Sequence, residues 1–200
     1  MTVSSIKGAF GAGCVFSADG SPLGDEFQVN STTAGSQDLP AVAGNPLGGF
    51  VVVWESYYQD GSFDGVIGRL CANSGAFLND EFLVNESVAW NQSIPGVAVA
   101  EDGSFVVVWE DDAGLDGAFG SIRGRWFDGS ASPLGGGFQI NSYGAGEQRR
   151  PSVAIEADGR AVVVWESRTG QDGSGYGVYG RVLVPDGGFL SEEFQLNSHT

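Results

Sequence analysis

The sequence predicts an all-β protein, a β-propeller-like array of four-stranded antiparallel blades with about three and a half blades in the chain. The segment VVVWE occurs at 51–55, 106–110 and 162–166. The motif FQVN, or a close variant, starts at residues 27, 82, 138 and 194. A fixed period of roughly 55 residues is typical of propellers and other repeat arrays. Glycine accounts for 33 of 200 residues, which suits short strands joined by tight turns.

Each repeat contains four strand signals in the same order. A proline lies near the start of the first strand, and a turn rich in glycine leads to the second strand with its VVVWE segment. Asp-Gly between apolar runs, as at 102–103 and 158–159, is typical of a hairpin because both positions accept positive φ. A glycine-rich loop leads to a third strand with Gly-Arg near its centre, and FQVN marks the fourth. Four antiparallel strands in a unit of this length are typical of a propeller blade.

The second strand of each repeat is apolar on both faces. Successive side chains of FVVVWE at 50–55 point to alternate sides of a sheet, and both sides are apolar. Such a strand needs a neighbour on each face, so we expect blades to pack against blades. The repeated Trp54, Trp109 and Trp165 are therefore interpreted as core side chains between blades rather than as platforms for sugars.

The repeats start part-way through a blade. The segment before the first FQVN matches only the third and fourth strands of a later repeat. Three and a half blades cannot close a ring alone, so we expect the chain to associate with itself, as a homo-oligomer or a larger array. The predicted units are a half blade at 1–30 and blade repeats at 31–85, 86–141 and 142–200.

The net charge of the chain excludes some classes of partner. Nine basic and 25 acidic side chains give a formal net charge of −16. This charge repels phosphates and anionic lipids, so we expect no nucleic-acid partner. No stretch approaches the length of a membrane span, so no membrane insertion is expected, and the start of the chain has no signal-peptide pattern. Two cysteines, Cys14 and Cys71, are too few for a disulfide framework.

An acid and a guanidinium recur at fixed positions of each blade. The acid follows the tryptophan of the second strand, and the arginine lies in the third strand. Opposite charges on neighbouring antiparallel strands stabilise each other, which predicts one structural ion pair per blade. The predicted pairs are Glu55 with Arg69, Glu110 with Arg125 and Glu166 with Arg181.

Aspartates recur in the loop between the second and third strands. Calcium binds six to eight oxygen atoms from carboxylates and carbonyls, which Asp-Gly loops can supply in part. Asp-Gly is also ordinary turn chemistry, so the two interpretations stay open. The candidate calcium ligands are Asp60, Asp64, Asp116 and Asp172, and no other cofactor is expected.

The sequence gives little sign of enzyme chemistry. His199 is the only histidine and lies next to the C-terminus, so a Ser-His-Asp or Cys-His device is hard to build. The acids of the repeat keep the repeat symmetry, whereas an active site should break it. We therefore predict no catalytic residue and a non-enzymatic protein. A propeller glycosidase that uses a pair of carboxylates is the one catalytic alternative left open.

The repeat unit resembles one found in very large bacterial surface and secreted proteins. The segments DGSFVVVWE at 102–110, GRW at 124–126 and GGFQIN at 136–141 carry the resemblance, which extends from about Gly8 to Asn197. It implies an extracellular or cell-surface location and a role in adhesion or assembly.

A multivalent lectin, with one weak carbohydrate site per blade, is the alternative function. Repeated weak sites gain affinity through multivalency. Aromatic side chains in the loops after the second strands would stack on sugars, with glycans as the partner. The candidate ligand-binding residues are Tyr57, Tyr58, Phe119 and Tyr176.

Overall fold

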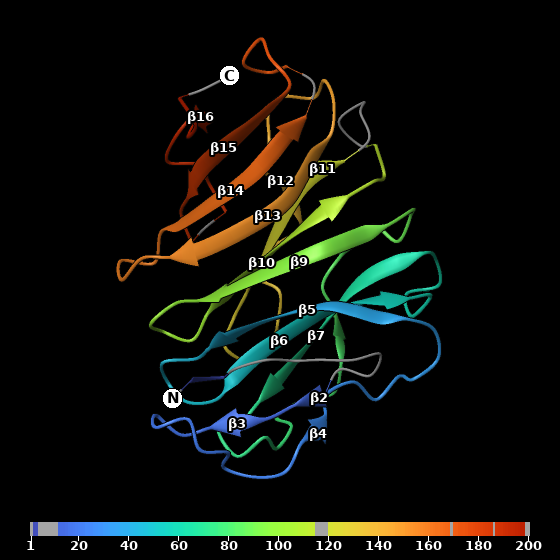
Figure 1. Ribbon diagram of the computed structural model, residues 1–200, viewed down its shortest axis with the longest axis vertical. Helices are drawn as coiled ribbons and strands as arrows, with labels where there is room; N and C mark the ends of the chain where they lie inside the picture. Colours follow the sequence, from blue (N-terminus) through green and yellow to red (C-terminus); the bar gives the residue numbers. More distant parts are fainter. Residues whose placement is uncertain (1, 4–11, 115–119, 169, 186, 199–200) are drawn as a thin grey trace.

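The computed structural model describes residues 2–3, 12–114, 120–168, 170–185 and 187–198. It contains three four-stranded antiparallel sheets in which strands pair in chain order, and this confirms the predicted all-β, propeller-like architecture (Figure 1). Within the described ranges, no helix is long and apolar enough to cross a membrane. The first blade comprises β5 (Gln37–Gly44), β6 (Phe50–Tyr57), β7 (Asp64–Cys71) and β8 (Phe82–Leu83); the second, β9 (Gln92–Val99), β10 (Phe105–Asp111), β11 (Ser121–Phe127) and β12 (Phe138–Gln139); the third, β13 (Gln148–Ile155), β14 (Ala161–Arg168), β15 (Tyr176–Leu183) and β16 (Phe194–Gln195).

Four short strands are described before the first blade. β2 (Ala12–Gly13) pairs with β4 (Phe27–Gln28), and these two correspond to the third and fourth strands of a blade. β1 (Thr2–Val3) pairs with β3 (Val15–Phe16) on the edge that a second strand occupies in the complete blades. The half blade therefore has a short additional strand that the repeat pattern did not predict.

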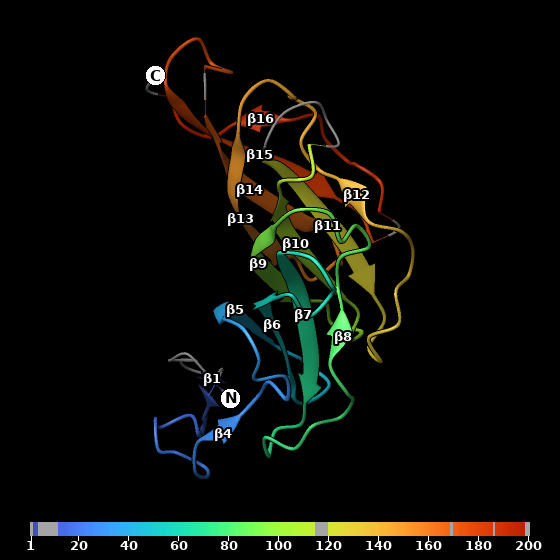
Figure 2. The same ribbon diagram turned by 90° about the vertical axis from the view of Figure 1, so that its right-hand side faces the viewer.

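The first strands of the three blades lie next to one another. β9 contacts both β5 and β13, so it is the central one of the three. Figure 2 shows β5, β9 and β13 along one side of the molecule, and β8 and β12 along the other. This is the arrangement of a propeller, in which first strands line the axis and fourth strands form the rim.

The blades pack face to face through the apolar second strands. Val51 and Val53 of the first blade lie in one core cluster with Phe105 and Val107 of the second. Their alternate neighbours face the opposite way, since Trp54 packs with residues of the half blade. Both faces of β6 are therefore buried, as the alternating pattern predicts.

A β-bulge interrupts the first strand of every blade at the same place. The register between first and second strands shifts there in all three blades. The residues before the prolines that recur in each blade have positive φ, namely 45° at Leu39, 51° at Ile94 and 53° at Arg150. Non-glycine residues adopt this conformation at a cost of about 1–3 kcal/mol, and such bulges often lie near functional sites.

Candidate functional site

The candidate site lies at one end of the three blades. The antiparallel register pairs Gln37 at the start of β5 with Ser56 near the end of β6, and Tyr57 at the end of β6 with Asp64 at the start of β7. The second and third blades have the same register. The starts of the first and third strands and the ends of the second strands therefore meet at one end, which we call the variable end.

The residue types at the variable end differ from blade to blade. The position held by Asp38 in the first blade is Ser93 in the second and Arg149 in the third. The end of the second strand and the start of the third strand vary in the same way. Their residues are Tyr57, Asp112 and Arg168, and Asp64, Gly120 and Tyr176. The repeat symmetry is thus broken where a single asymmetric ligand could bind, although the strand interiors keep it.

Glu55 lies buried in the seam between the first and second blades. Only 9% of its surface is exposed, and its Oε1 accepts a hydrogen bond of 2.5 Å from the backbone N–H of Ile94 at the bulge of β9. Asp38 lies directly opposite Glu55 in the β5–β6 ladder, which places the two side chains on the same face. Burial raises the pKa of Glu55 to about 7, and the charges of Asp64, Asp38 and Glu110 act in the same direction. Glu55 therefore keeps its proton up to about pH 7.

Glu110 occupies the same position of the second blade but has a cationic partner. Its Oε1 accepts a hydrogen bond of 2.9 Å from Nε of Arg149, and its Oε2 accepts one of 3.3 Å from the backbone N–H of Arg150. Burial raises the pKa of Glu110, while Arg149 opposes this rise. Each of the two glutamates accepts a hydrogen bond from the backbone N–H at the bulge of the next blade. They differ in their cationic partner, because Ser93 stands beside Glu55 at the position that Arg149 holds beside Glu110.

The predicted Glu–Arg pairs within each blade are wrong. Glu55 lies opposite Val66 in the β6–β7 ladder, and Arg69 is three positions further along. Side chains alternate faces along a strand, so glutamate and arginine point to opposite sides of the sheet. Each arginine instead reaches back to the backbone carbonyl of the residue that follows the fourth strand of the preceding unit. The Nη1 donors and acceptors are Arg69 to Val29 at 2.7 Å, Arg125 to Val84 at 3.1 Å and Arg181 to Ile140 at 2.8 Å.

The repeated tryptophans are core residues, as predicted. Trp54, Trp109 and Trp165 are at most 4% exposed. The indole Nε1 of Trp54 donates a hydrogen bond of 2.9 Å to Gln37 Oε1 at the start of the first strand, and Trp165 makes the same bond in the third blade. In these two blades the hydrogen bond joins the second strand to the start of the first strand at the variable end.

The loop aspartates cap turns. Asp60 accepts hydrogen bonds from the backbone N–H of Ser62 and from Nδ2 of Asn85, and Asp172 accepts one from the backbone N–H of Ser174. Burial, followed by the charges of Asp38 and Asp60, raises the pKa of Asp64. The predicted ligand Asp116 lies outside the described residues, as does His199. Among the described residues, no group of three acids, histidines or cysteines could hold a metal ion, so the calcium interpretation gains no support.

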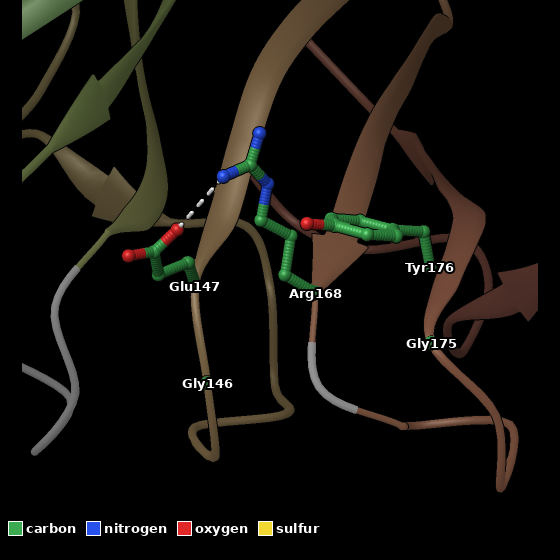
Figure 3. A pocket seen from close by; sticks show the side chains of 5 residues that line it. All are labelled: Gly146, Glu147, Arg168, Gly175 and Tyr176. Carbon is green, nitrogen blue, oxygen red and sulfur yellow. Dashed lines mark hydrogen bonds and ion pairs between the residues drawn. The ribbon is translucent and has the colours of Figure 1, made fainter.

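Three of the predicted ligand-binding aromatics lie at the variable end, and Phe119 is outside the described residues. Tyr57 and Tyr58 are exposed on the first blade, with ring centroids 4.8 Å apart. Tyr176 is on the third blade beside a pocket of about 400 Å³ (Figure 3). In this pocket the guanidinium of Arg168 lies 5.1 Å from the Tyr176 ring and forms an ion pair of 3.4 Å with Glu147.

Sequence reasoning missed Asp38, Phe63 and Trp90. Phe63 and Trp90 are exposed, and their parallel rings lie 5.9 Å apart next to Tyr58. Positions that stay constant between repeats do not include Asp38 or Trp90, whose residue types occur in only one of the three blades at those positions. Positions that vary within an otherwise regular repeat were the signal, and the position of Asp38, Ser93 and Arg149 is one of them.

No protein-family model matches the chain, and no curated protein matches it. Similar solved structures include an endo-arabinase from Bacteroides thetaiotaomicron, with a TM-score of 0.57, 18% identity and coverage of 88% of this chain and 68% of that one. An α-L-arabinofuranosidase from Fusarium graminearum, solved with an iminosugar inhibitor, has a TM-score of 0.58 and 14% identity, with coverage of 86% of this chain and 55% of that one. An α-L-arabinofuranosidase from Lactobacillus brevis has a TM-score of 0.52 and 14% identity, with coverage of 91% of this chain and 63% of that one. The chain thus spans between about half and two thirds of those proteins.

These comparisons overturn the prediction of a non-enzymatic adhesion module and its lectin alternative. The three solved proteins reported above are an arabinase and two arabinofuranosidases by name, not adhesins. The sequence argument failed because it searched for catalytic acids only among the repeated columns. Identities of 14–18% establish a shared fold. The resemblance to surface-protein repeats stays a prediction.

Proposed function

We propose that the protein is a glycoside hydrolase whose site lies at the variable end between the first two blades. The single observation that carries the proposal is the unlike carboxyl pair of Asp38 and Glu55, which face each other across the β5–β6 ladder. Asp38 is exposed, whereas Glu55 is buried and its pKa is about 7. Two carboxyl groups in environments of such different polarity are what glycoside hydrolysis requires.

Each carboxyl group has a distinct role in this proposal. Glu55 gives its proton to the glycosidic oxygen as the bond from that oxygen to the anomeric carbon breaks. The exposed carboxylate of Asp38 takes a proton from the water molecule whose oxygen attacks the anomeric carbon. The products are two sugars with free hydroxyl groups, and exchange with solvent returns the proton from Asp38 to Glu55. The acidic surroundings favour a neutral glycan over an anionic one.

Arabinofuranosides are the substrates to test first, because the structural neighbours are named as arabinases and arabinofuranosidases. The chain would be assayed on an aryl α-L-arabinofuranoside and on linear arabinan. Glu55→Gln and Asp38→Asn should each lower kcat by about 10²–10⁴-fold, since each removes one proton-transfer group. Glu166→Gln changes the matching position of the third blade and should leave the rate unchanged.

The pH profile tests the role of Glu55 as the acid. Activity should fall as the pH rises above about 7, because Glu55 then loses the proton that it must donate. Absence of turnover by the unchanged chain on both substrates, or full activity of both variants, would contradict the proposal.

We also infer that a second copy of the chain covers the outer face of the third blade. Val66 and Val84 of the first blade are completely buried, as are Ile122 and Ile140 of the second. The matching residues of the third blade are Val178, 40% exposed, and Leu196, 51% exposed. In the first two blades this face is covered by another unit of the same repeat. A copy of this chain therefore offers the matching surface.

A further inference from the structure

Four aromatic side chains gather at the variable end of the first two blades. Tyr57, Tyr58 and Phe63 come from the end of β6 and the loop that follows it, and Trp90 comes from the loop before β9. Their exposed fractions are 42%, 57%, 43% and 56%, respectively. The rings form a continuous series, since Tyr57 contacts Tyr58, Tyr58 lies 6.5 Å from Phe63, and Phe63 lies 5.9 Å from Trp90. We call this series the aromatic platform.

The fold holds the platform in place at some cost. Tyr58 and Trp90 both have φ of 65°, a conformation that non-glycine residues rarely adopt. The backbone N–H of Tyr58 donates a hydrogen bond of 2.7 Å to the carbonyl of Phe63, which closes the loop that carries both rings. Phe63 and Trp90 are parallel to within 2° although they belong to different loops. The two rings are stacked, so each offers the face that points away from the other to a ligand.

The platform borders the proposed catalytic pair. Tyr57 and Tyr58 follow Glu55 by two and three residues, and Trp90 precedes by four the Ile94 amide that binds Glu55. Asp64 pairs with Tyr57 in the β6–β7 ladder, and its charge raises the pKa of Glu55. The rings and the carboxyl groups of Asp38, Asp64 and Glu55 therefore lie at the same end of the first two blades.

The chemistry of the surface selects the ligand. Segments 57–64 and 86–94 contain aromatic, acidic and amide side chains but no lysine or arginine, so an anionic ligand would be repelled. Flat exposed rings suit the C–H face of a sugar, and the neighbouring carboxylates can accept hydrogen bonds from its hydroxyl groups. A neutral sugar unit presents both kinds of surface.

We propose that Tyr58, Phe63 and Trp90 form a binding subsite for one sugar unit of a neutral oligosaccharide, next to the Asp38–Glu55 pair. The inference rests on the proposed function for its substrate class. It adds a binding site beside the seam between the first two blades. It predicts that an oligosaccharide binds more tightly than a monosaccharide.

Trp90 reports on this subsite directly. Trp54, Trp109, Trp126 and Trp165 are at most 4% exposed, so Trp90 is the one exposed indole of the five in the chain. Acrylamide, which is neutral, should quench the fluorescence of Trp90 in the free protein. Saturation with a short arabino-oligosaccharide should protect it, whereas arabinose should protect it less at equal concentration. The Glu55→Gln variant would be used so that the oligosaccharide is not cleaved.

Variants then test each ring by calorimetry. In the Glu55→Gln background, Trp90→Ala and Phe63→Ala should each weaken binding of the arabino-oligosaccharide by about tenfold, and Trp90→Phe should restore most of it because it keeps a ring. Leu47→Ala changes a side chain that is 72% exposed at the opposite end of the blade, and it should leave the affinity unchanged.

The outcomes separate this inference from the proposed function. Oligosaccharide binding that depends on Trp90, without turnover by the unchanged chain, would support the platform and contradict the hydrolase. Turnover with a KM that Trp90→Ala and Phe63→Ala leave unchanged would overturn the platform and support the hydrolase. No binding of the oligosaccharide by the Glu55→Gln protein would also overturn the platform.

Discussion

Glu55 and Glu110 show how one side chain of the second blade decides the chemistry of a repeated position. Both carboxyl groups accept a hydrogen bond from the bulge of the next blade. Arg149 neutralises Glu110. Ser93, at the matching position of the second blade, gives Glu55 no charge to pair with. Burial of an acid without a cation favours its protonated form. The same position therefore holds an ion pair in one seam and, in the other, an acid that is protonated below about pH 7.

The pKa of Glu55 predicts how stability depends on pH. The group binds its proton more tightly in the folded chain, where its pKa is about 7, than in the unfolded chain, where the ordinary value is 4.5. Its contribution is therefore complete below about pH 4.5 and is lost as the pH rises through about 7, a change of about 3 kcal/mol. Glu55→Gln should remove this part of the decrease, as measured by urea unfolding between pH 4 and 8. Identical pH profiles of the two proteins would contradict the assignment.

At the scale of elements, the packing of a fourth-strand ring explains why a glycine recurs before the arginine of the third strand. Gly68 lies opposite Phe82, and a Cβ at this position would come within 2.5 Å of the Phe82 ring. Phe82 in turn packs against Phe105 and Phe127 of the second blade, with ring centroids 6.2 and 5.6 Å away. The glycine therefore lets a fourth-strand ring lie over the third strand and reach the next blade.

Replacement of this glycine tests the packing. Gly68→Ala should lower the free energy of unfolding by about 1–3 kcal/mol, because the Phe82 ring must move out of a filled space. Gly44→Ala, also in a strand, is the matched control, since a Cβ there meets nothing within 4 Å. Thermal and urea unfolding would measure both variants. Equal stability of the two would mean that Phe82 moves without cost.

At the scale of the whole molecule, neighbouring blades are linked by two repeated contacts. The second-strand glutamates of the first and second blades each reach forward to the next blade. The third-strand arginine of every blade reaches back to the preceding unit. Among the described residues of the third blade, Glu166 forms its ion pair with Arg150 of its own blade, at 3.3 Å. Its forward contact is thus available for another copy.

Association through this face is measurable by light scattering behind a sizing column. The chain should elute above the mass of one copy, 20.8 kDa. Val178→Glu and Leu196→Glu should return it to that mass, because a buried unpaired charge in the contact is costly. Both side chains are already exposed in the single chain, so the substitutions should not unfold it. Leu47→Glu is the control. Monomeric behaviour of the unchanged chain at high concentration would contradict the association.

The sequence by itself determined the repeat, the four strands of each blade and the burial of both strand faces. These properties follow from local alternation and from turn chemistry, which a single strand and its hairpin already express. The interpretation of Trp54, Trp109 and Trp165 as core followed from the same alternation, and all three are buried.

Only the tertiary structure decided which charged groups meet. The predicted Glu55–Arg69 pair failed because a three-residue offset across a ladder puts the two side chains on opposite faces. Asp38 and Glu55 lie 17 positions apart and meet through the β5–β6 register. Phe63 and Trp90 meet across a seam between blades. A repeat pattern shows what the blades have in common, whereas the candidate site depends on the positions where they differ and on how the blades pack.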